Sequence, residues 1–470
     1  MGPKSAGPKS NDMFRQRLDE LVNPLHPLAR LAGHIDWQVF EQKWAAHFPS
    51  SRGRPATPTR LIAGLLYLQH TFALSDEDVV WGWVENPYWQ LFCGETWFQH
   101  QPPIDPSSLT RWRKRIGEEG LEWMLTETIK AAESTNVVKA KSYEKIIVDS
   151  TVQEKAIAHP TDSKLLERAR QHLVKLAAEG SLVLRQNYNR EAPKLAAQTG
   201  RYAHAKQYKR MRASLKKLKT VVGRVWRDVQ RQLAKLPAAM QDKANDLLAK
   251  IKRLLTQKQK DKNKLYSLHA PEAECISKGK SRQPYEFGVK VSIATTHKEG
   301  LVVGMRSMPG NPYDGHTLFE ALEQVAILTD CQPKEVFVDL GYRGVEVQPG
   351  TKVYHPKLKR NITQRLRRDI RRRSAIEPAI GHMKNDGRLR RNWLKGADGD
   401  AFHALLCGCG HNLRMILRKL RLLLALRPTE PIWSQLLRLV LHHMLGRDNA
   451  RLPFALTGMG TEPVPLRFAF

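Results

Sequence analysis

The stretch that decides the fold is KEVFVDLGYRG, residues 334–344. Its apolar run 336–338 has the β-branched and aromatic character of a buried strand, and the glycines that follow end that strand. Asp339 is therefore expected where a central strand opens into a loop. Taken alone, an aspartate at such a point can equally cap a helix or stabilise a turn. The other segments of the chain decide between these roles.

A second stretch, EKIIVDSTVQ at residues 144–153, repeats the pattern. Its apolar run 146–148 predicts another buried strand, which we expect to end at Asp149. Two carboxylates that follow apolar strands lie close together when those strands are neighbours in one sheet. The sequence thus predicts that Asp149 and Asp339 meet at one sheet edge.

The segments between and after these strands predict a mixed α/β domain. Strands are expected at 285–296 and 300–308, joined as a β-hairpin through Lys298, Glu299 and Gly300. Helical spacing of apolar residues at 318–328 leads into the strand before Asp339, and TKVYHP at 351–356 predicts a further short strand. The expected order is strand, insertion, hairpin, helix, strand.

A third acid lies in RRRSAIEPAIGHMKNDGRLRRNWL, residues 371–394. Arg373, Glu377 and Lys384 are separated by four and seven residues, which places all three on one face of a helix. Such a charged stripe usually faces solvent. Ile376 and Met383 on other faces indicate that this helix packs against another part of the protein, so Glu377 can project towards the sheet edge.

The charge of the chain indicates a polyanionic partner. Among 470 residues, 77 are Lys or Arg and 46 are Asp or Glu, giving a formal net charge of +31. Nucleic acid is the first candidate for this partner. A membrane surface would also attract such charge, but we find no apolar run long enough to span a bilayer and no charged-then-apolar leader at the start. We therefore expect a cytoplasmic protein. Its five cysteines form neither a disulfide framework nor a paired zinc motif.

The amino-terminal part predicts a small all-helical domain over residues 13–135. Ser75 is expected to cap a helix whose first turn is acidic, and DPSSLTRWRKRIG at 105–117 predicts a short basic helix suited to a DNA groove. Its candidate DNA contacts are Arg111, Arg113, Lys114 and Arg115. The alternative is a solvent-exposed amphipathic helix with Trp112 in the core.

Residues 163–280 are predicted to form a helical insertion with a basic face. From 161 to 280 there are 29 Lys and Arg against 10 Asp and Glu, and the run 201–219 holds eight basic residues and no acid. This imbalance favours sequence-independent phosphate contacts, with Lys206, Lys209, Arg210 and Arg212 as candidates. The alternative is a helical hairpin that supports the fold or forms a dimer contact.

Four motifs together carry a family resemblance: VDSTVQ, PGNPYDGHTL, VDLGYRG and RSAIEPAIGHMK. Over about residues 55–420 the chain resembles the DDE transposases of bacterial insertion sequences, most closely insertion-sequence family five. The resemblance implies a ribonuclease-H-like mixed sheet in which Asp149, Asp339 and Glu377 hold two divalent metal ions. Oxygen ligands without Cys or His favour Mg²⁺ or Mn²⁺, and two such ions suit in-line phosphoryl transfer.

The same resemblance assigns roles around the acids. The family signature of Tyr, Arg, Glu and Lys matches Arg373, Glu377 and Lys384, but its tyrosine position holds Ile370. Either no residue performs the function of the family's tyrosine in this chain, or Tyr342 performs it instead. We expect Arg373 and Lys384 to hold phosphates, and Tyr342 with Arg343 to position flanking DNA.

The sequence therefore predicts a transposase that binds the terminal inverted repeats of its element and cleaves and joins double-stranded DNA, as a homodimer. Its expected parts are a disordered leader at 1–12, the helical domain, and a catalytic domain at 140–162 and 281–400. The insertion at 163–280 follows the first catalytic strand, and helices and a tail occupy 401–470. The alternatives are a metal-dependent nuclease without joining activity and a domesticated DNA-binding protein.

Overall fold

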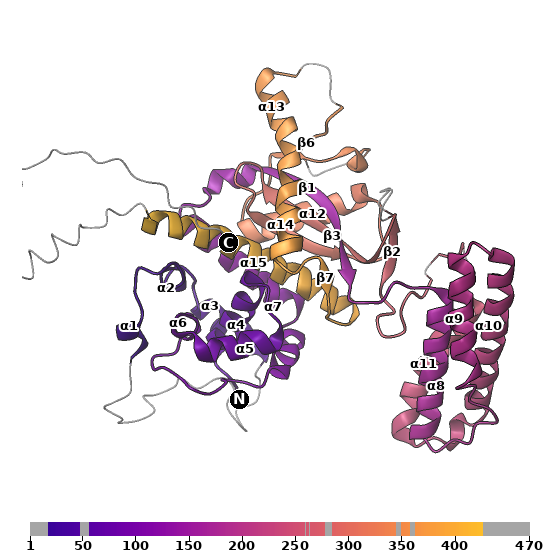
Figure 1. The fold of residues 1–470 in the computed structure, drawn as a ribbon. Helices are drawn as coiled ribbons and strands as arrows, with labels where there is room; N and C mark the ends of the chain where they lie inside the picture. Colours follow the sequence, from indigo (N-terminus) through magenta and orange to yellow (C-terminus); the bar gives the residue numbers. More distant parts are fainter. Residues whose placement is uncertain are drawn as a thin grey trace, which may run out of the picture. The chain divides into compact units, whose positions relative to one another are not determined.

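The protein is described here from a computed structural model (Figure 1). It describes residues 17–47, 56–258, 260–262, 264–277, 284–344, 349–357 and 362–425. The leader predicted at 1–12 lies outside these residues, as does the part of the predicted carboxy-terminal segment beyond 425. No helix in the described ranges is both long enough and apolar enough to cross a membrane.

A mixed sheet forms the centre of the part of the chain that contains Asp149 and Asp339. Its path is β2-β3-β1-β5-β6, with β4 added on β3 and β7 added on β1. β1 runs antiparallel to β3 and parallel to β5 and β7, and β6 runs parallel to β5. The strands are β1 Lys145–Lys155, β2 Glu274–Ser277, β3 Tyr285–Thr296, β4 Val302–Met308, β5 Glu335–Phe337, β6 Lys352–Tyr354 and β7 Arg391–Asn392.

The strands follow the predicted order, but the first strand ends later than predicted. The hairpin of β3 and β4, the strand before Asp339 and the strand at 352–354 are confirmed. The prediction that the first strand ends at Asp149 is wrong, since β1 continues to Lys155. Its second half keeps pairing with β3 as far as Glu154 opposite Gly288, so the ladder does not stop at the acid.

The amino-terminal part is helical, as predicted. Ser75 caps α5 by accepting a hydrogen bond from the backbone N–H of Asp78, whose side chain in turn accepts from the N–H of Ser75. The helices are α1 Leu18–Leu21, α2 Pro27–Ala32, α3 Gln38–Trp44, α4 Thr59–Thr71, α5 Asp76–Glu85, α6 Pro87–Phe92 and α7 Ser107–Ser134.

The predicted short basic helix is the first part of α7. Gly117 interrupts α7 with φ 67° and ψ −171°, a backbone conformation that glycine adopts without strain. The side chain of Asp105 accepts a hydrogen bond from the N–H of Ser107 at 2.9 Å and so stabilises the start of this helix. The kink separates a basic segment of about three turns from the rest of α7, which is largely buried.

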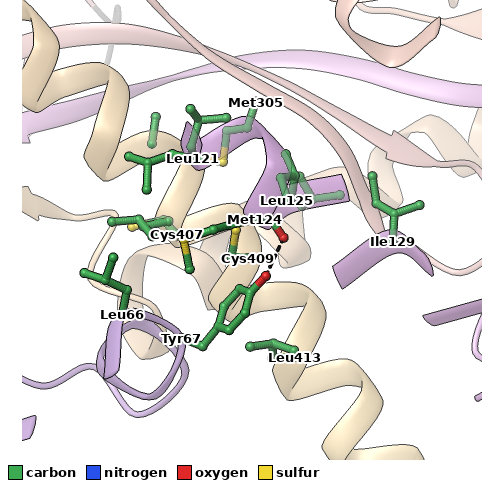
Figure 2. Packing of buried hydrophobic residues seen from close by; sticks show 14 of the residues in the cluster. Leu66, Tyr67, Leu121, Met124, Leu125, Ile129, Met305, Cys407, Cys409 and Leu413 are labelled. Carbon is green, nitrogen blue, oxygen red and sulfur yellow. Dashed lines mark hydrogen bonds between the residues drawn. The ribbon is translucent and has the colours of Figure 1, made fainter. Parts of the chain in front are cut away.

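One hydrophobic core joins the amino-terminal helices to the sheet. It contains residues of α4, α7, β1, β3, β4 and α12 (Asp314–Thr329), together with the last described helix, α15 (Gly396–Ala425). Figure 2 shows Leu66 and Tyr67 of α4 beside Cys407, Cys409 and Leu413 of α15. The Tyr67 hydroxyl donates a 2.7 Å hydrogen bond to the carbonyl of Met124 in α7.

The insertion between β1 and β2 has a hydrophobic core of its own, built from apolar residues of its four long helices and the connections between them. These helices are α8 Asp162–Glu179, α9 Glu191–His204, α10 Tyr208–Arg231 and α11 Ala238–Thr256. The long helices expected from the sequence at 163–265 are therefore present. The helices after the central strands are α13 Gln364–Arg372 and α14 Ile376–Asp386.

Candidate active site

Parallel pairing of β1 with β5 brings two of the predicted acids to one place. Ile147 pairs with Phe337 in this register. Asp149 lies two residues after Ile147 in β1, and Asp339 lies two residues after Phe337, the last residue of β5. The two acids therefore occupy equivalent positions along neighbouring segments of the sheet. Adjacent strands lie about 4.8 Å apart. The sheet register therefore sets the two carboxylates side by side.

Asp339 is held in its loop by the backbone that follows it. The strand β5 ends at Phe337, and a short 3₁₀ turn, η4 Leu340–Tyr342, begins directly after Asp339. The Oδ1 atom of Asp339 accepts a 2.7 Å hydrogen bond from the N–H of Gly341. This bond leaves Oδ2 of Asp339 for another partner.

Another acid, Asp314, lies beside Asp339, although the local patterns of the sequence did not place it in the site. A Cβ atom placed on Gly341 would lie 3.0 Å from Asp339 Oδ1 and 3.2 Å from Asp314 Oδ2. Asp314 begins α12 and forms an ion pair with Lys290 of β3 at 3.2 Å. The motif PYDGHTL at 312–318 was the only signal that could have indicated Asp314.

Apolar residues hold the helix α14 on the sheet, and Ile376 is the one next to Glu377. Ile376 packs with Ile147 of β1 and Phe337 of β5, and all three side chains are buried. Ile370, at the family's tyrosine position, packs against the same cluster. Since Glu377 follows Ile376, this contact brings the third acid to the side of the sheet where Asp149 lies.

Arg373 joins the first acid to the third. Its Nη1 atom lies 3.4 Å from Asp149 Oδ2, and its Nη2 atom lies 2.9 Å from Glu377 Oε1. The side chains of Arg373 and Asp149 are 16% exposed, whereas that of Glu377 is 63% exposed. The guanidinium thus supplies the positive charge between two carboxylates that would otherwise repel.

Tyr342 lies inside the protein rather than on a DNA-facing surface. It is 3% exposed, and burial together with the charges of Asp314, Asp149 and Asp339 raises the pKa of its phenol above the usual range. The expectation that Tyr342 contacts flanking DNA is therefore wrong for this conformation. Arg343 is exposed directly after it.

The three predicted acids are near one another, but Glu377 reaches Asp149 through Arg373. In the part of the chain that the structure describes, one set of three potential metal ligands has donor atoms within 4.8 Å of one another, and that set is His70, His403 and Cys407. It is buried in the main core. Burial and the charges of Arg388 and Arg113 lower the pKa of His403 to about 3, and the same guanidinium charges disfavour a bound cation.

The basic helix at the start of α7 divides into buried and exposed residues. Arg113 is 2% exposed and forms an ion pair with Asp76 and a 2.7 Å hydrogen bond to Gln69. The expectation that Arg113 contacts DNA is therefore wrong, because its guanidinium is already bound inside the protein. Arg111, Lys114 and Arg115 lie on the exposed side, and Trp112 is buried as the alternative interpretation expected.

The basic candidates of the insertion are all on its surface. Lys206 lies in the connection between α9 and α10, and Lys209, Arg210 and Arg212 lie in the first turns of α10. All four side chains are exposed. Within the described residues none of them forms an ion pair, so their charge is available to a polyanion.

Comparison with known proteins agrees with this geometry. Residues 16–115 match a family described as "Transposase domain (DUF772)", and residues 255–413 match one described as "Transposase DDE domain". The chain belongs to the DDE transposases. Asp339 and Glu377 of this transposase lie in the second matched segment, whereas Asp149 precedes it because the helical insertion separates β1 from the rest of the sheet.

A curated relative extends the comparison. The transposase is 50% identical over 208 residues to a Rhizobium meliloti protein described as "Uncharacterized protein ORF8 in nfe locus". The aligned residues cover 44% of this chain and 100% of the relative. No solved structure matches. The family assignment establishes a phosphoryl-transfer enzyme of DNA transposition that binds DNA and uses divalent metal ions, on a ribonuclease-H-like mixed sheet.

Proposed function

We propose that this transposase binds the terminal inverted repeats of an insertion sequence of family five, then cleaves the element ends and joins them to target DNA. The observation that carries this proposal is the β1–β5 register, which sets Asp149 beside Asp339 while Arg373 links Asp149 to Glu377. These contacts support a common site for Asp149, Asp339 and Glu377, three acids from distant segments of the chain.

The donor set suits two Mg²⁺ or Mn²⁺ ions held by Asp149, Asp339 and Glu377. All their donor atoms are carboxylate oxygens, and Arg373 supplies positive charge to two of these acids, Asp149 and Glu377. When bound, such ions activate the attacking hydroxyl and stabilise the leaving oxygen of an in-line displacement. With such ions bound, Arg373 would be free to bind a phosphate beside the scissile bond, and Lys384, two turns further along α14, a more distant phosphate of the same strand.

The other parts of the transposase would bind DNA away from the acids. Arg111, Lys114 and Arg115 on the first part of α7 suit the element ends, and the basic surface of α10 suits phosphates without sequence preference. Cutting two ends of one element favours a homodimer. We also propose the domain boundaries expected from the sequence: the helical domain ends at residue 135, the insertion lies between residues 162 and 280, and the catalytic domain ends at residue 400.

The first test replaces each acid separately: Asp149→Ala, Asp339→Ala and Glu377→Ala. Each variant should lose Mg²⁺-dependent cleavage of labelled element ends while its affinity for the same DNA stays near that of the wild type, because the basic surfaces are unchanged. Cleavage on gels and binding by polarisation measure the two properties. An acid whose loss leaves substantial cutting does not belong to the site.

Strand joining separates this function from its alternatives. Wild-type protein, pre-cleaved labelled ends and a target plasmid should give covalently joined products that none of the three acid variants forms. Cleavage without joined products would favour the metal-dependent nuclease. Binding without either activity would favour the domesticated DNA-binding protein.

A further inference from the structure

A groove of about 1460 Å³ lies away from the three acids, between the start of α5 and the far ends of β1 and α14. Its lining includes Glu154 of β1, five residues beyond Asp149, and Lys384 of α14, seven residues beyond Glu377. At the usual rise per residue these positions lie about 16 Å along the strand and about 10 Å along the helix. Two elements thus lead from the catalytic acids to the groove.

The two sides of the groove carry opposite charge. The side formed by α14 and β7 bears Lys384, Arg390 and Arg391, of which both arginines are exposed. The groove is also lined by the acidic first turn of α5, its acidic side, where Glu77 and Asp78 are exposed. A duplex presents phosphates on both of its sides, so the acidic side would repel one of its backbones.

Aromatic side chains are exposed in the same groove. Trp393 is 57% exposed and Tyr285 is 54% exposed, and both line it. The guanidinium carbon of Arg388 lies 5.3 Å from the centroid of the Trp393 ring, so Arg388 covers one face of that ring. Large exposed aromatic rings beside arginines are the usual platform on which unpaired bases stack.

We infer that this groove binds a short single-stranded segment of DNA, with its phosphates on the α14 and β7 side and its bases on Trp393 and Tyr285. The acidic side then faces the base edges, where carboxylates can accept hydrogen bonds from base N–H groups that are unpaired in a single strand. This inference rests on the proposed function, since the strand that enters the groove is one that passes the three acids.

Photocrosslinking of the wild-type full chain tests the position of the strand. The probe is a twelve-nucleotide oligothymidylate that carries 5-iodouracil, and a hairpin duplex with the same label serves as the comparison. Mass spectrometry of the crosslinked peptides should find Trp393 or Tyr285 attached to the single strand. Crosslinks that fall only outside the groove would overturn the inference.

Affinity supplies the second test, with a matched control. The double variant Tyr285→Ala/Trp393→Ala should weaken binding of the unlabelled oligothymidylate by roughly 5- to 150-fold for each stacked base, while duplex affinity stays unchanged. The control is Trp81→Ala, because Trp81 is 58% exposed and lies outside the groove. Equal losses in both proteins, or equal losses on both DNAs, would refute single-strand binding.

The outcome is separable from that of the proposed function. Crosslinking and affinity are measured without Mg²⁺ and do not depend on cutting. A wild-type protein that crosslinks through Trp393 but never cleaves would contradict the proposed function alone. A protein that cleaves and joins DNA without binding oligothymidylate in the groove would contradict the inference alone.

Discussion

Gly341 lies beside two carboxylates, and this position leaves little space for a side chain. A methyl group there would stand 3.0 Å from Asp339 Oδ1 and 3.2 Å from Asp314 Oδ2. We therefore expect Gly341→Ala to move Asp339 by a few tenths of an ångström and to lower the cleavage rate roughly tenfold, since catalysis is sensitive to such displacements. Single-turnover cleavage in Mg²⁺ measures this change.

A glycine without such neighbours serves as the control. Gly381 lies in α14 and would have nothing within 4 Å of an added methyl group. Gly381→Ala should leave cleavage unchanged and raise the unfolding free energy by about 0.5 to 1 kcal/mol, because alanine favours helix. Equal cleavage by the Gly341→Ala variant and the wild type would show that the carboxylates tolerate displacement.

Single residues also mark the limit of what the sequence predicts. Asp339 and Glu377 could be proposed from the sequence because local patterns, a strand end and a helix face, present them. The nearness of Asp314 to Asp339 depends on where α12 begins relative to η4, a tertiary relation without a local pattern. The burial of Arg113 and Tyr342 is tertiary in the same sense, because composition alone favours exposed arginine and a partly exposed tyrosine.

At the scale of elements, one buried ion pair ties α7 to α5. Burial opposes ionisation of Asp76, but hydrogen bonds and charge from Arg113 outweigh it and lower the pKa of that carboxyl. A lowered pKa stabilises the fold above the unfolded-state pKa, near 3.9, and this contribution disappears as the pH falls through the folded-state pKa. Arg113→Ala should therefore cost roughly 2 to 4 kcal/mol at neutral pH.

Denaturant unfolding from pH 7 to pH 3 measures this contribution. The difference between wild type and Arg113→Ala should be largest at neutral pH and should shrink as the pH falls below about 4 towards the lowered pKa of Asp76 in the folded wild type. The exposed pair Arg17 and Asp19 gives the control, and Arg17→Ala should change stability little. A loss that stays constant with pH would assign the effect to packing instead.

The basic surface of α10 makes a prediction about salt. Changing Lys206, Lys209, Arg210 and Arg212 to Ala should flatten the plot of log affinity against log salt on duplex DNA by up to about 4 units, or about 0.9 for each phosphate that the variant no longer neutralises. Preference for the element ends over random DNA should hardly change, because binding to phosphates carries no sequence information. Polarisation at several salt concentrations measures both quantities.

A control with the same charge change uses basic residues that already face acids. Lys175, Arg231, Lys243 and Lys250 each form an ion pair within the insertion. Their replacement by Ala should alter the salt slope much less than the α10 variant does. Parallel slopes for the α10 variant and the wild type would favour the alternative of a helical support or dimer contact.

The sequence predicted most elements, but it placed the end of β1 too early. The run 146–148 is continuous and apolar, whereas the rest of the strand is polar in part and resembles a loop. Those residues remain extended because β3 pairs with them through Glu154 opposite Gly288. There a Cβ atom on Gly288 would lie 1.9 Å from the carbonyl oxygen of Gln153, a close approach that local propensity does not report.

At the scale of the molecule, the described chain has two substantial hydrophobic cores that share no residues. One contains Leu405 of α15 and the other contains Leu218 of α10, and both leucines are fully buried. We expect two thermal transitions, since separate cores unfold as separate cooperative units. Leu218→Ala and Leu405→Ala should each cost about 2 to 5 kcal/mol, but in different transitions.

Scanning calorimetry measures both transitions in each variant. The transition of the unchanged core then serves as the internal control. Leu218→Ala should lower the melting temperature of the insertion alone, and Leu405→Ala that of the body that holds the acids. Cleavage at a temperature below both transitions should survive in both variants. One common transition that shifts equally in both proteins would show that the cores unfold together.

The shared packing of α4 with α15 also has a consequence during synthesis. Leu66 and Tyr67 leave the ribosome long before Cys409 and Leu413, which complete their surroundings (Figure 2). At ordinary translation rates the interval is roughly 20 to 70 s. A nascent chain therefore carries its amino-terminal helices without their full core until translation has passed both later acids. We therefore expect unfinished polypeptides, and chains that end before α15, to be unable to cut DNA.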